Sequence, residues 1–266
     1  MFPRLHVAAF VASIVIAILT GVSCVTAAEV KDVLAPNGKL RVGVYPGSPL
    51  SMTVDAKTGE KHGIAFDLGR ELAQWLGVFF EPVVHPRIAD ILSAMKAGEV
   101  DFTISNITAL RAQNVDFSQP LLSLELGYLV GQTSAIATIE EIDRTGVRIG
   151  VAQGSTSEGT LPKLLRKASV VSASTLTEAI RQIASNQLQG FATNKAILFE
   201  MAGELPGARI LDGRWGVERI GTAIPKGRDA GLGYVRRFVE EARQKGNLTR
   251  AIERAGLRGT ISSDEN

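Results

Sequence analysis

The stretch DFTISNITALRAQNVDFSQP, residues 101–120, decides how the rest of this chain is interpreted. Apolar side chains at positions 100, 102 and 104 alternate with polar ones at 101, 103 and 105, which is typical of a β-strand. The strand ends in small polar residues that include Asn106 and Thr108, and the cation Arg111 follows at once. A second short run, residues 115–118, leads to the proline that ends the stretch.

The polar end of this strand predicts a site for a small anionic group. Hydroxyl and backbone N–H groups donate hydrogen bonds, and the planar guanidinium of Arg111 fits a carboxylate with two parallel bonds. Arg111 has an alternative, structural role, because Asp116 lies close behind it in the sequence and would pair with it. We favour the ligand role, since hydroxyls precede the arginine and the stretch holds no nucleophile paired with a base.

The composition excludes several classes of function. The chain has 266 residues, is 45% hydrophobic and carries 29 basic against 27 acidic side chains, a net charge of +2. This near balance argues against nucleic-acid binding, which usually needs a marked basic excess. After residue 28 the only histidines are His62 and His85, which lack the spacing of a metal site, and neither a Walker-type lysine nor a GxSxG elbow occurs. We therefore expect no metal, no cofactor and no catalytic residue.

Residues 1–28 are predicted to be a signal peptide. Arg4 supplies the positive charge, residues 7–21 form an apolar run that is short for a membrane span, and small residues precede position 28. Two alternatives stay open: a retained N-terminal anchor, and lipid attachment at Cys24, which we rank below cleavage because the lipobox leucine is missing. Removal of this segment would leave an almost neutral chain without cysteine, which excludes disulfides and thiolate chemistry.

The remaining chain alternates strands and helices in two similar units. Residues 40–44 predict a first strand, a helix ending at Gly77 follows, and the apolar run 78–84 predicts a buried parallel strand. The pattern R-[VI]-G-V-x-x-G-S occurs at residues 41–48 and again at 148–155. Since helices and strands alternate after both copies, the sequence predicts two α/β lobes, each with its own sheet.

Polar residues stand at the predicted strand ends of both units, where open α/β sheets bind their ligands. The candidate ligand-binding residues are Tyr45, Ser48, His85, Asn106, Thr108, Arg111, Ser155, Thr156 and Asn194. If the two lobes face each other, these residues line one cleft. A ligand that touches both lobes would then hold them closed.

Some of these residues also have simpler structural interpretations. Ser155 forms a capping box with Glu158 and so caps a helix, which leaves any ligand contact to Thr156 and the neighbouring N–H groups. His85 stands beside a proline and an arginine and fits an ordinary loop histidine better than a ligand-binding one. Tyr45 is either an aromatic wall of the cleft or a surface residue.

Several longer segments carry a resemblance to a known family. They read GIAFDLGRELA from residue 63, SAMKAGEVDFTISNIT from residue 93, RAQNVDFSQP from residue 111, GVAQGST from residue 150 and IPKG from residue 224. The chain resembles the family 3 extracellular solute-binding proteins, which serve ABC importers for polar amino acids and related solutes. The resemblance covers essentially the whole chain after the signal peptide.

The resemblance implies an α/β fold of the periplasmic binding protein type II kind, with two α/β lobes joined by a two-strand hinge and a cleft between them. By analogy, the first hinge crossing falls near residues 124–131 and the return near residues 218–223. The first lobe would comprise residues 29–126 and 219–266, and the second lobe residues 127–218.

The resemblance also implies a function. Arg111 would bind the carboxylate of a small anionic or zwitterionic solute, with help from Thr108 and from the loop at Ser155 and Thr156. The protein would act as a monomer in the periplasm and deliver its solute to the permease of an ABC transporter.

Two positions depart from the pattern of the amino-acid binders in this family. Those proteins usually carry one aspartate near the end of the first strand and another in the second lobe, both facing the α-ammonium. Tyr45 and Asn194 stand at these positions here, and the loop between Ser105 and Arg111 is about two residues shorter. We therefore expect a solute with a carboxylate or similar anion, and weak binding of a simple α-amino acid.

Two other functions compete with transport. One is an enzyme on the same fold, such as the dehydratase branch of the family, which would need an acid or base in the cleft. No carboxylate occurs around residues 194–197, so we rank this function low. The other is a sensor that binds a ligand and docks to a receptor, which neighbouring permease and ATPase genes would distinguish from transport.

Overall fold

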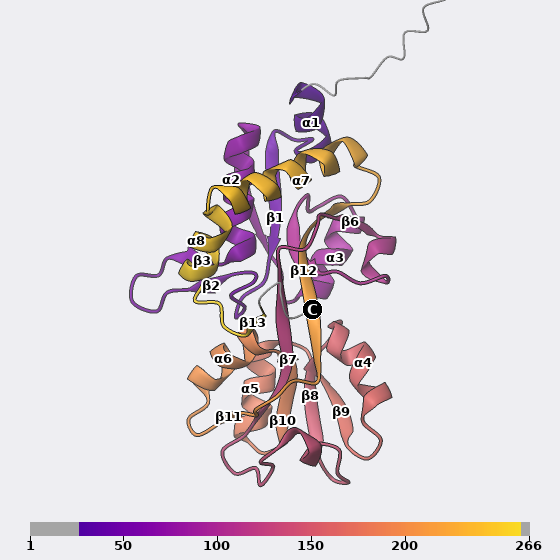
Figure 1. Cartoon of the computed structure of the whole chain (residues 1–266), viewed down its shortest axis with the longest axis vertical. Helices are drawn as coiled ribbons and strands as arrows, with labels where there is room; N and C mark the ends of the chain where they lie inside the picture. The colour runs from indigo at the N-terminus through magenta and orange to yellow at the C-terminus, as the bar shows by residue number, and fades with distance from the viewer. Residues whose placement is uncertain (1–26, 262–266) are drawn as a thin grey trace, which may run out of the picture.

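A computed structural model describes residues 27–261 of the chain. The prediction of a signal peptide falls almost wholly on residues 1–26, and Cys24 with it, outside the described part. Two α/β lobes lie one above the other, joined by the long strands β7 (Leu122–Val130) and β12 (Gly216–Pro225) (Figure 1). The two-lobe α/β architecture is thus confirmed. Among residues 27–261, no helix combines the length and the apolar character that crossing a membrane requires.

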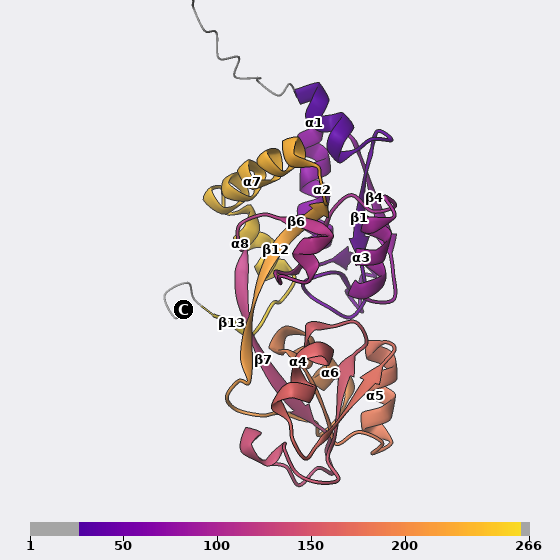
Figure 2. The ribbon, with the colours of Figure 1, turned by 90° about the vertical axis from the view of Figure 1, so that its right-hand side faces the viewer.

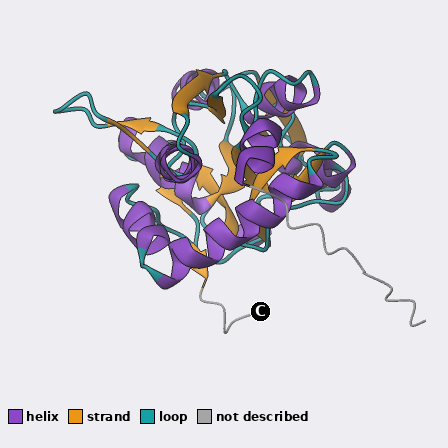
Figure 3. Cartoon of the chain, turned by 90° about the horizontal axis from the view of Figure 1, so that it is seen from above, coloured by secondary structure: helices purple, strands orange, loops and turns teal. Residues whose placement is uncertain are grey.

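The first lobe contains most of the N-terminal half and the C-terminal helices. Its helices are α1 (Ala27–Leu34), α2 (Ile64–Leu76), α3 (Ile88–Lys96), the short 3-10 helix η1 (Arg111–Gln113), α7 (Asp229–Gln244) and α8 (Asn247–Arg254). Its strands are β1 (Lys39–Val44), β2 (Thr53–Val54), β3 (Lys61–His62), β4 (Phe79–Val84), β5 (Thr103–Asn106) and β6 (Val115–Phe117). Seen from above, helices lie around the strands of this lobe (Figure 3).

Helix α2 ends where the sequence predicts. Gly77 has a left-handed backbone with φ 61°, and its N–H bonds to carbonyl oxygens of the last helical turn. Glycine adopts this conformation without the steric cost of a Cβ atom, so it stops the helix and turns the chain into β4.

Strand β4 is parallel to β1, as predicted, but it is not a buried strand. It pairs only with β1 among the described strands, and Phe79 and Val84 are 77% and 52% exposed. An apolar run by itself does not distinguish an edge strand from a central one, because burial depends on which neighbours cover it. The prediction of burial for residues 78–84 is therefore wrong.

A buried carboxylate ties the N-terminal and C-terminal parts of the first lobe together. Asp101 is fully buried and accepts from the Arg41 guanidinium at 2.7 Å and from the Arg228 guanidinium at 2.9 Å. Arg41 lies on β1, whereas Arg228 directly precedes α7. Because a buried charge must be paired, this triad fixes the start of α7 on the first lobe.

The second lobe is built from the middle of the chain. Its strands are β8 (Arg148–Ala152), β9 (Ser169–Ala173), β10 (Gly190–Asn194) and β11 (Arg209–Ile210). Its helices are the short 3-10 helix η2 (Ile139–Glu141), α4 (Thr156–Leu164), α5 (Leu176–Ala184) and α6 (Lys195–Glu204). Strands β8, β9 and β10 run parallel, and β7 closes the sheet in the antiparallel sense.

The hinge strands make one continuous sheet through both lobes, in the order β5-β12-β7-β10-β8-β9, so the prediction that each lobe has its own sheet is wrong. Strand β12 pairs with β7 between the lobes and with β5 and β6 in the first lobe. The last strand, β13 (Thr260–Ile261), also pairs with β7. Figure 2 shows β7 and β12 running side by side from one lobe into the other. The two predicted crossings, near residues 124–131 and 218–223, fall on these two strands.

Candidate functional site

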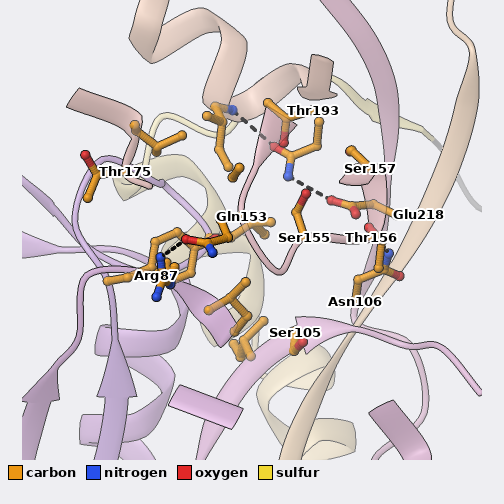
Figure 4. A pocket seen from close by; sticks show the side chains of 18 of the residues that line it. Arg87, Ser105, Asn106, Gln153, Ser155, Thr156, Ser157, Thr175, Thr193 and Glu218 are labelled. Atoms are coloured by element: carbon orange, nitrogen blue, oxygen red, sulfur yellow. Dashed lines mark hydrogen bonds between the residues drawn. The ribbon is translucent and has the colours of Figure 1, made fainter. Parts of the chain in front are cut away.

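A cavity of about 70 Å³ lies between the two lobes beside the hinge. Part of its wall comes from the first lobe and the strand β12, and part from the loops and helix starts of the second lobe (Figure 4). Six of the nine predicted site residues line it: Tyr45, Asn106, Arg111, Ser155, Thr156 and Asn194. The tertiary structure thus brings together polar strand ends from both halves of the sequence.

Arg111 opens the 3-10 helix η1 and extends its side chain to the cavity. Its Nη1 donates to Ser105 Oγ at 2.7 Å. Asp116, the alternative partner predicted from the sequence, pairs instead with Lys226 Nζ at 2.5 Å and accepts from the N–H of Gly227 at 3.0 Å. The guanidinium of Arg111 therefore has no carboxylate partner within residues 27–261.

Glu218, on the hinge strand β12, lines the same cavity and is only 7% exposed. Its Oε1 accepts from Asn194 Nδ2 at 2.8 Å, and Figure 4 shows its side chain among the polar residues beside the hinge. Burial raises the pKa of Glu218, while the hydrogen bond from Asn194 and the charge of Arg111 act in the opposite direction. No carboxylate occurs in residues 194–197, but the fold brings one to Asn194 from β12.

The sequence analysis missed Glu218 although a signal existed. The residue begins the predicted return crossing, and a hinge strand borders the cleft between the lobes that it joins. Asn194 links helix α6 to Glu218. Its Oδ1 caps the helix by accepting from the N–H of Ile197 at 3.1 Å, and its Nδ2 donates to Glu218.

Arg111 and Glu218 form a separated pair of opposite charges in one cavity. Each influences the other electrostatically, yet the two form no ion pair in the described structure. Burial lowers the pKa of Arg111, and the charge of Glu218 counteracts this. The space between a buried cation and a buried anion, both lacking a charged partner, is suited to a molecule that carries both charges.

The loop before α4 contributes from the second lobe. Ser155 caps α4 by accepting from the N–H of Glu158 at 3.2 Å, as the capping box predicts, but Glu158 returns to the N–H of Gly154 at 2.7 Å rather than to Ser155. Thr156 Oγ1 accepts from Asn106 Nδ2 at 3.2 Å, a bond that joins the two lobes. The N-terminus of α4 therefore faces the cavity next to a direct contact between the lobes.

Tyr45 lines the cavity at the end of β1, and its hydroxyl lies 3.3 Å from Ser48 Oγ. Burial raises the pKa of Tyr45, so the phenol stays protonated. Ser48 is completely buried behind it and does not line the cavity.

Two further predicted residues also lie outside the cavity. His85 continues β4, where its N–H donates to the Val44 carbonyl at 2.9 Å. Thr108 Oγ1 accepts from the N–H of Arg111 at 3.2 Å, so it holds the turn that carries the arginine. His85 and Thr108 do lie near the predicted strand ends, but the direction of a side chain after a strand depends on the loop that follows.

Arg87 closes the cleft at the end away from the hinge. The residue precedes α3 in the first lobe, and its Nη1 donates to Gln153 Oε1 and to the Ser174 carbonyl at 3.4 Å, both in the second lobe (Figure 4). Gly154 approaches the first lobe so closely that an added Cβ would lie 2.3 Å from the Ala89 Cβ. These contacts describe a closed arrangement of the lobes.

The family model described as "Bacterial extracellular solute-binding proteins, family 3" matches residues 40–256. The chain therefore belongs to this family of solute-binding proteins. Among curated proteins, the ABC transporter glutamine-binding protein GlnH of Bacillus subtilis (strain 168) is 27% identical over 213 residues, which are 77% of this chain and 75% of that protein. A glutamine-binding protein of Geobacillus stearothermophilus is 26% identical over 193 residues, 71% of this chain and 73% of that protein.

Solved structures agree with this fold. An ancestral amino acid-binding protein, described as a precursor of cyclohexadienyl dehydratase, matches with a TM-score of 0.73 and 27% identity over 84% of this chain and 97% of its own. An ancestral arginine-binding protein bound to glutamine matches with a TM-score of 0.73 and 26% identity, over 82% of this chain and 97% of its own. The type II periplasmic binding protein fold implied by the sequence resemblance is confirmed.

Proposed function

We propose that this protein is the periplasmic receptor of an ABC importer and captures an α-amino acid in its zwitterionic form. The solute carboxylate binds the Arg111 guanidinium, and the solute ammonium binds Glu218. The observation that carries this proposal is the buried pair of opposite charges in one cavity, neither with an ionic partner in residues 27–261. The names of the curated relatives, both glutamine-binding proteins, support the same class of solute.

The energetics favour a zwitterion over a plain anion. An ion buried without a partner costs several kcal/mol, and a ligand with the complementary charge removes that cost. A deaminated acid would neutralise Arg111 but would leave Glu218 buried without a cation. The proposal therefore replaces our expectation, based on Tyr45 and Asn194, that an α-amino acid binds weakly.

Movement of the two lobes about the hinge would couple solute binding to delivery of the solute to the permease. We propose that residues 29–126 with 219–266, and residues 127–218, move as two bodies about the strands β7 and β12. The solute contacts Arg111 in the first lobe and the start of α4 in the second, so it stabilises the closed arrangement. The closed monomer then docks to a membrane permease, which opens it.

Isothermal titration tests this proposal with three probes that share one side chain: an L-amino acid, its deaminated acid and its decarboxylated amine. We expect the amino acid to bind at least 100-fold more tightly than either single-charge analogue. Equal binding of the deaminated acid would contradict the role of Glu218. The variants Arg111→Gln and Glu218→Gln should each weaken amino-acid binding. Glu240→Gln, which removes an exposed carboxylate on α7, is the matched control and should bind as the wild type does.

A second candidate function rests on the same carboxyl group. Because burial raises the pKa of Glu218, its carboxyl group holds its proton to a higher pH than an exposed glutamate does, a property that favours general acids. The ancestral relative described as a precursor of a dehydratase keeps an enzyme of this fold in consideration. Proton NMR of the bound solute after prolonged incubation distinguishes the two functions: a receptor releases its solute unchanged, whereas an enzyme releases a product.

A further inference from the structure

The cavity is lined by charged side chains, by hydroxyl and amide side chains, and by a set of aliphatic side chains that this inference concerns. Arg111, Glu218 and Asn194 come together near the hinge, where the dashed bond from Asn194 to Glu218 lies in Figure 4. The aliphatic side chains that line the cavity are Leu50, Ile88, Ile104, Leu176, Ile197 and Ile220. Both lobes supply them, so closure wraps apolar surface around whatever extends from Arg111 and Glu218.

Two polar side chains at the far end of the cleft, Arg87 and Thr175, already take part in hydrogen bonds. Arg87 binds Asp90 of its own helix at 3.1 Å in addition to its bonds across the cleft to Gln153 and Ser174. Thr175 Oγ1 accepts from the N–H of Glu178 at 3.1 Å and so caps α5. Figure 4 places Arg87, Gln153 and Thr175 together, on the side of the cavity opposite Glu218.

Ile88 and Leu176, which directly follow Arg87 and Thr175 in the chain, also line the cavity. Leu176 packs closely on the first lobe, because its Cδ1 would lie 3.2 Å from a Cβ added to Gly47. Tyr45, elsewhere on the wall, has its hydroxyl within 3.3 Å of Ser48 Oγ. A polar solute side chain that reached this region would compete with the existing bonds for the Arg87 guanidinium and Gln153 Oε1.

The closed lobes also limit the length of the solute. In this arrangement the cavity between them has a volume of about 70 Å³. The Arg87 bridge to Gln153 and Ser174 closes the end opposite the hinge. A side chain as long as that of arginine would have to break this bridge.

We infer that the cleft selects α-amino acids with a short branched aliphatic side chain, of the size of valine, leucine or isoleucine. This inference rests on the proposed function and adds the identity of the side-chain subsite, with Ile88 and Leu176 as its specificity-determining residues. The inferred solute differs from that of the curated relatives, which are named as glutamine-binding proteins.

The expected discrimination follows from burial. Each methylene group buried against the aliphatic wall raises affinity about fourfold. The amide of a glutamine side chain, buried without a partner, would lower affinity by roughly 10- to 100-fold. The difference between leucine and glutamine is therefore large enough to measure by a direct titration.

Isothermal titration of the mature protein with L-leucine, L-valine, L-glutamine and L-arginine tests this inference. We expect leucine or valine to bind most tightly, and at least 10-fold more tightly than glutamine and arginine. Tighter binding of glutamine or arginine would overturn the aliphatic subsite and leave the amino-acid receptor intact. Failure of all four to bind would overturn the proposed function and the subsite together.

A matched pair of variants tests the wall itself. Leu176→Gln should weaken leucine binding by about 10-fold and narrow the gap between leucine and glutamine. Leu164→Gln makes the same change on α4 at a side chain that is 52% exposed and outside the cavity, so it should leave both affinities unchanged. Equal effects of the two variants would contradict the assignment. If circular dichroism shows that Leu176→Gln does not fold, the order of the four amino-acid affinities of the wild type tests the inference instead.

Discussion

Replacing Glu218 by glutamine should weaken solute binding and stabilise the empty protein at the same time. Glutamine keeps the shape of the side chain and its bond with Asn194 but removes the charge. A hydrogen bond to a charged group contributes about 1.5–3 kcal/mol, and tenfold in affinity corresponds to about 1.4 kcal/mol, so amino-acid binding should fall roughly 10- to 150-fold. Only 7% of Glu218 is exposed, which leaves little solvent to screen the interaction.

The raised pKa of Glu218 predicts how the stability of the empty protein and its amino-acid affinity change with pH. Burial raises the pKa of Glu218 in the folded protein above the value in the unfolded chain. The stabilising contribution of this group is therefore complete at low pH and is lost as the pH rises through the folded-state pKa. Amino-acid affinity should change the opposite way, because the ionised form binds the ammonium: it falls as the pH drops through the same pKa. Glu218→Gln should abolish both dependences.

Two measurements on the Glu218→Gln variant test the role of Glu218. Thermal unfolding without solute at pH 8 should show the Glu218→Gln variant more stable by about 1 kcal/mol, a rise in Tm of roughly 2–4 °C for a chain of this size. Titration calorimetry at a series of pH values from 4.5, the ordinary pKa of glutamate, upward should show an affinity that rises with pH for the wild type and a weak, flat one for the variant. A variant that is less stable than the wild type, or that binds the amino acid equally well, would refute the role of Glu218.

The remaining predictions concern closure and folding. Gly154→Ala should weaken binding at least 10-fold and leave the protein open in small-angle X-ray scattering, because the added Cβ would lie 2.3 Å from that of Ala89 and φ here is +73°; an unchanged affinity would show that the lobes close differently. Arg87→Ala should raise the solute dissociation rate several-fold in stopped-flow fluorescence, since it removes the bridge between the lobes; if only the association rate changes, the bridge does not hold the closed form. Asp101→Ala should cost about 3–5 kcal/mol of unfolding free energy in urea, because it removes the carboxylate that pairs the mostly buried guanidinium groups of Arg41 and Arg228; a loss below 1 kcal/mol would contradict this.

Much of the fold could be predicted because its signals are local. The helix that stops at Gly77 and the cap formed by Ser155 depend on contacts within a few residues, and the structure contains both. Strand β4 was misjudged in burial because its exposure depends on which strands pair with it, and that is not a local property.

The candidate site was predicted only in part for the same reason. Arg111 stands out because hydroxyls precede it within one loop. Glu218 does not, since it meets Asn194 and faces Arg111 only after the chain has crossed into the second lobe and returned along β12. Ser48 and Thr108 stand beside the right strand ends, yet their side chains support Tyr45 and the turn at Arg111 instead of lining the cavity.

The amino-acid sequence by itself determined the alternation of helices and strands, the two repeated units and the cationic half of the binding site. These follow from hydrophobic periodicity, capping and turn chemistry, which act over a few residues. Only the tertiary structure decided that the cleft also holds an anion, where the aliphatic wall lies and which residues bridge the lobes. The reason is that charge pairing and burial depend on distances in space between segments that the hinge strands bring together.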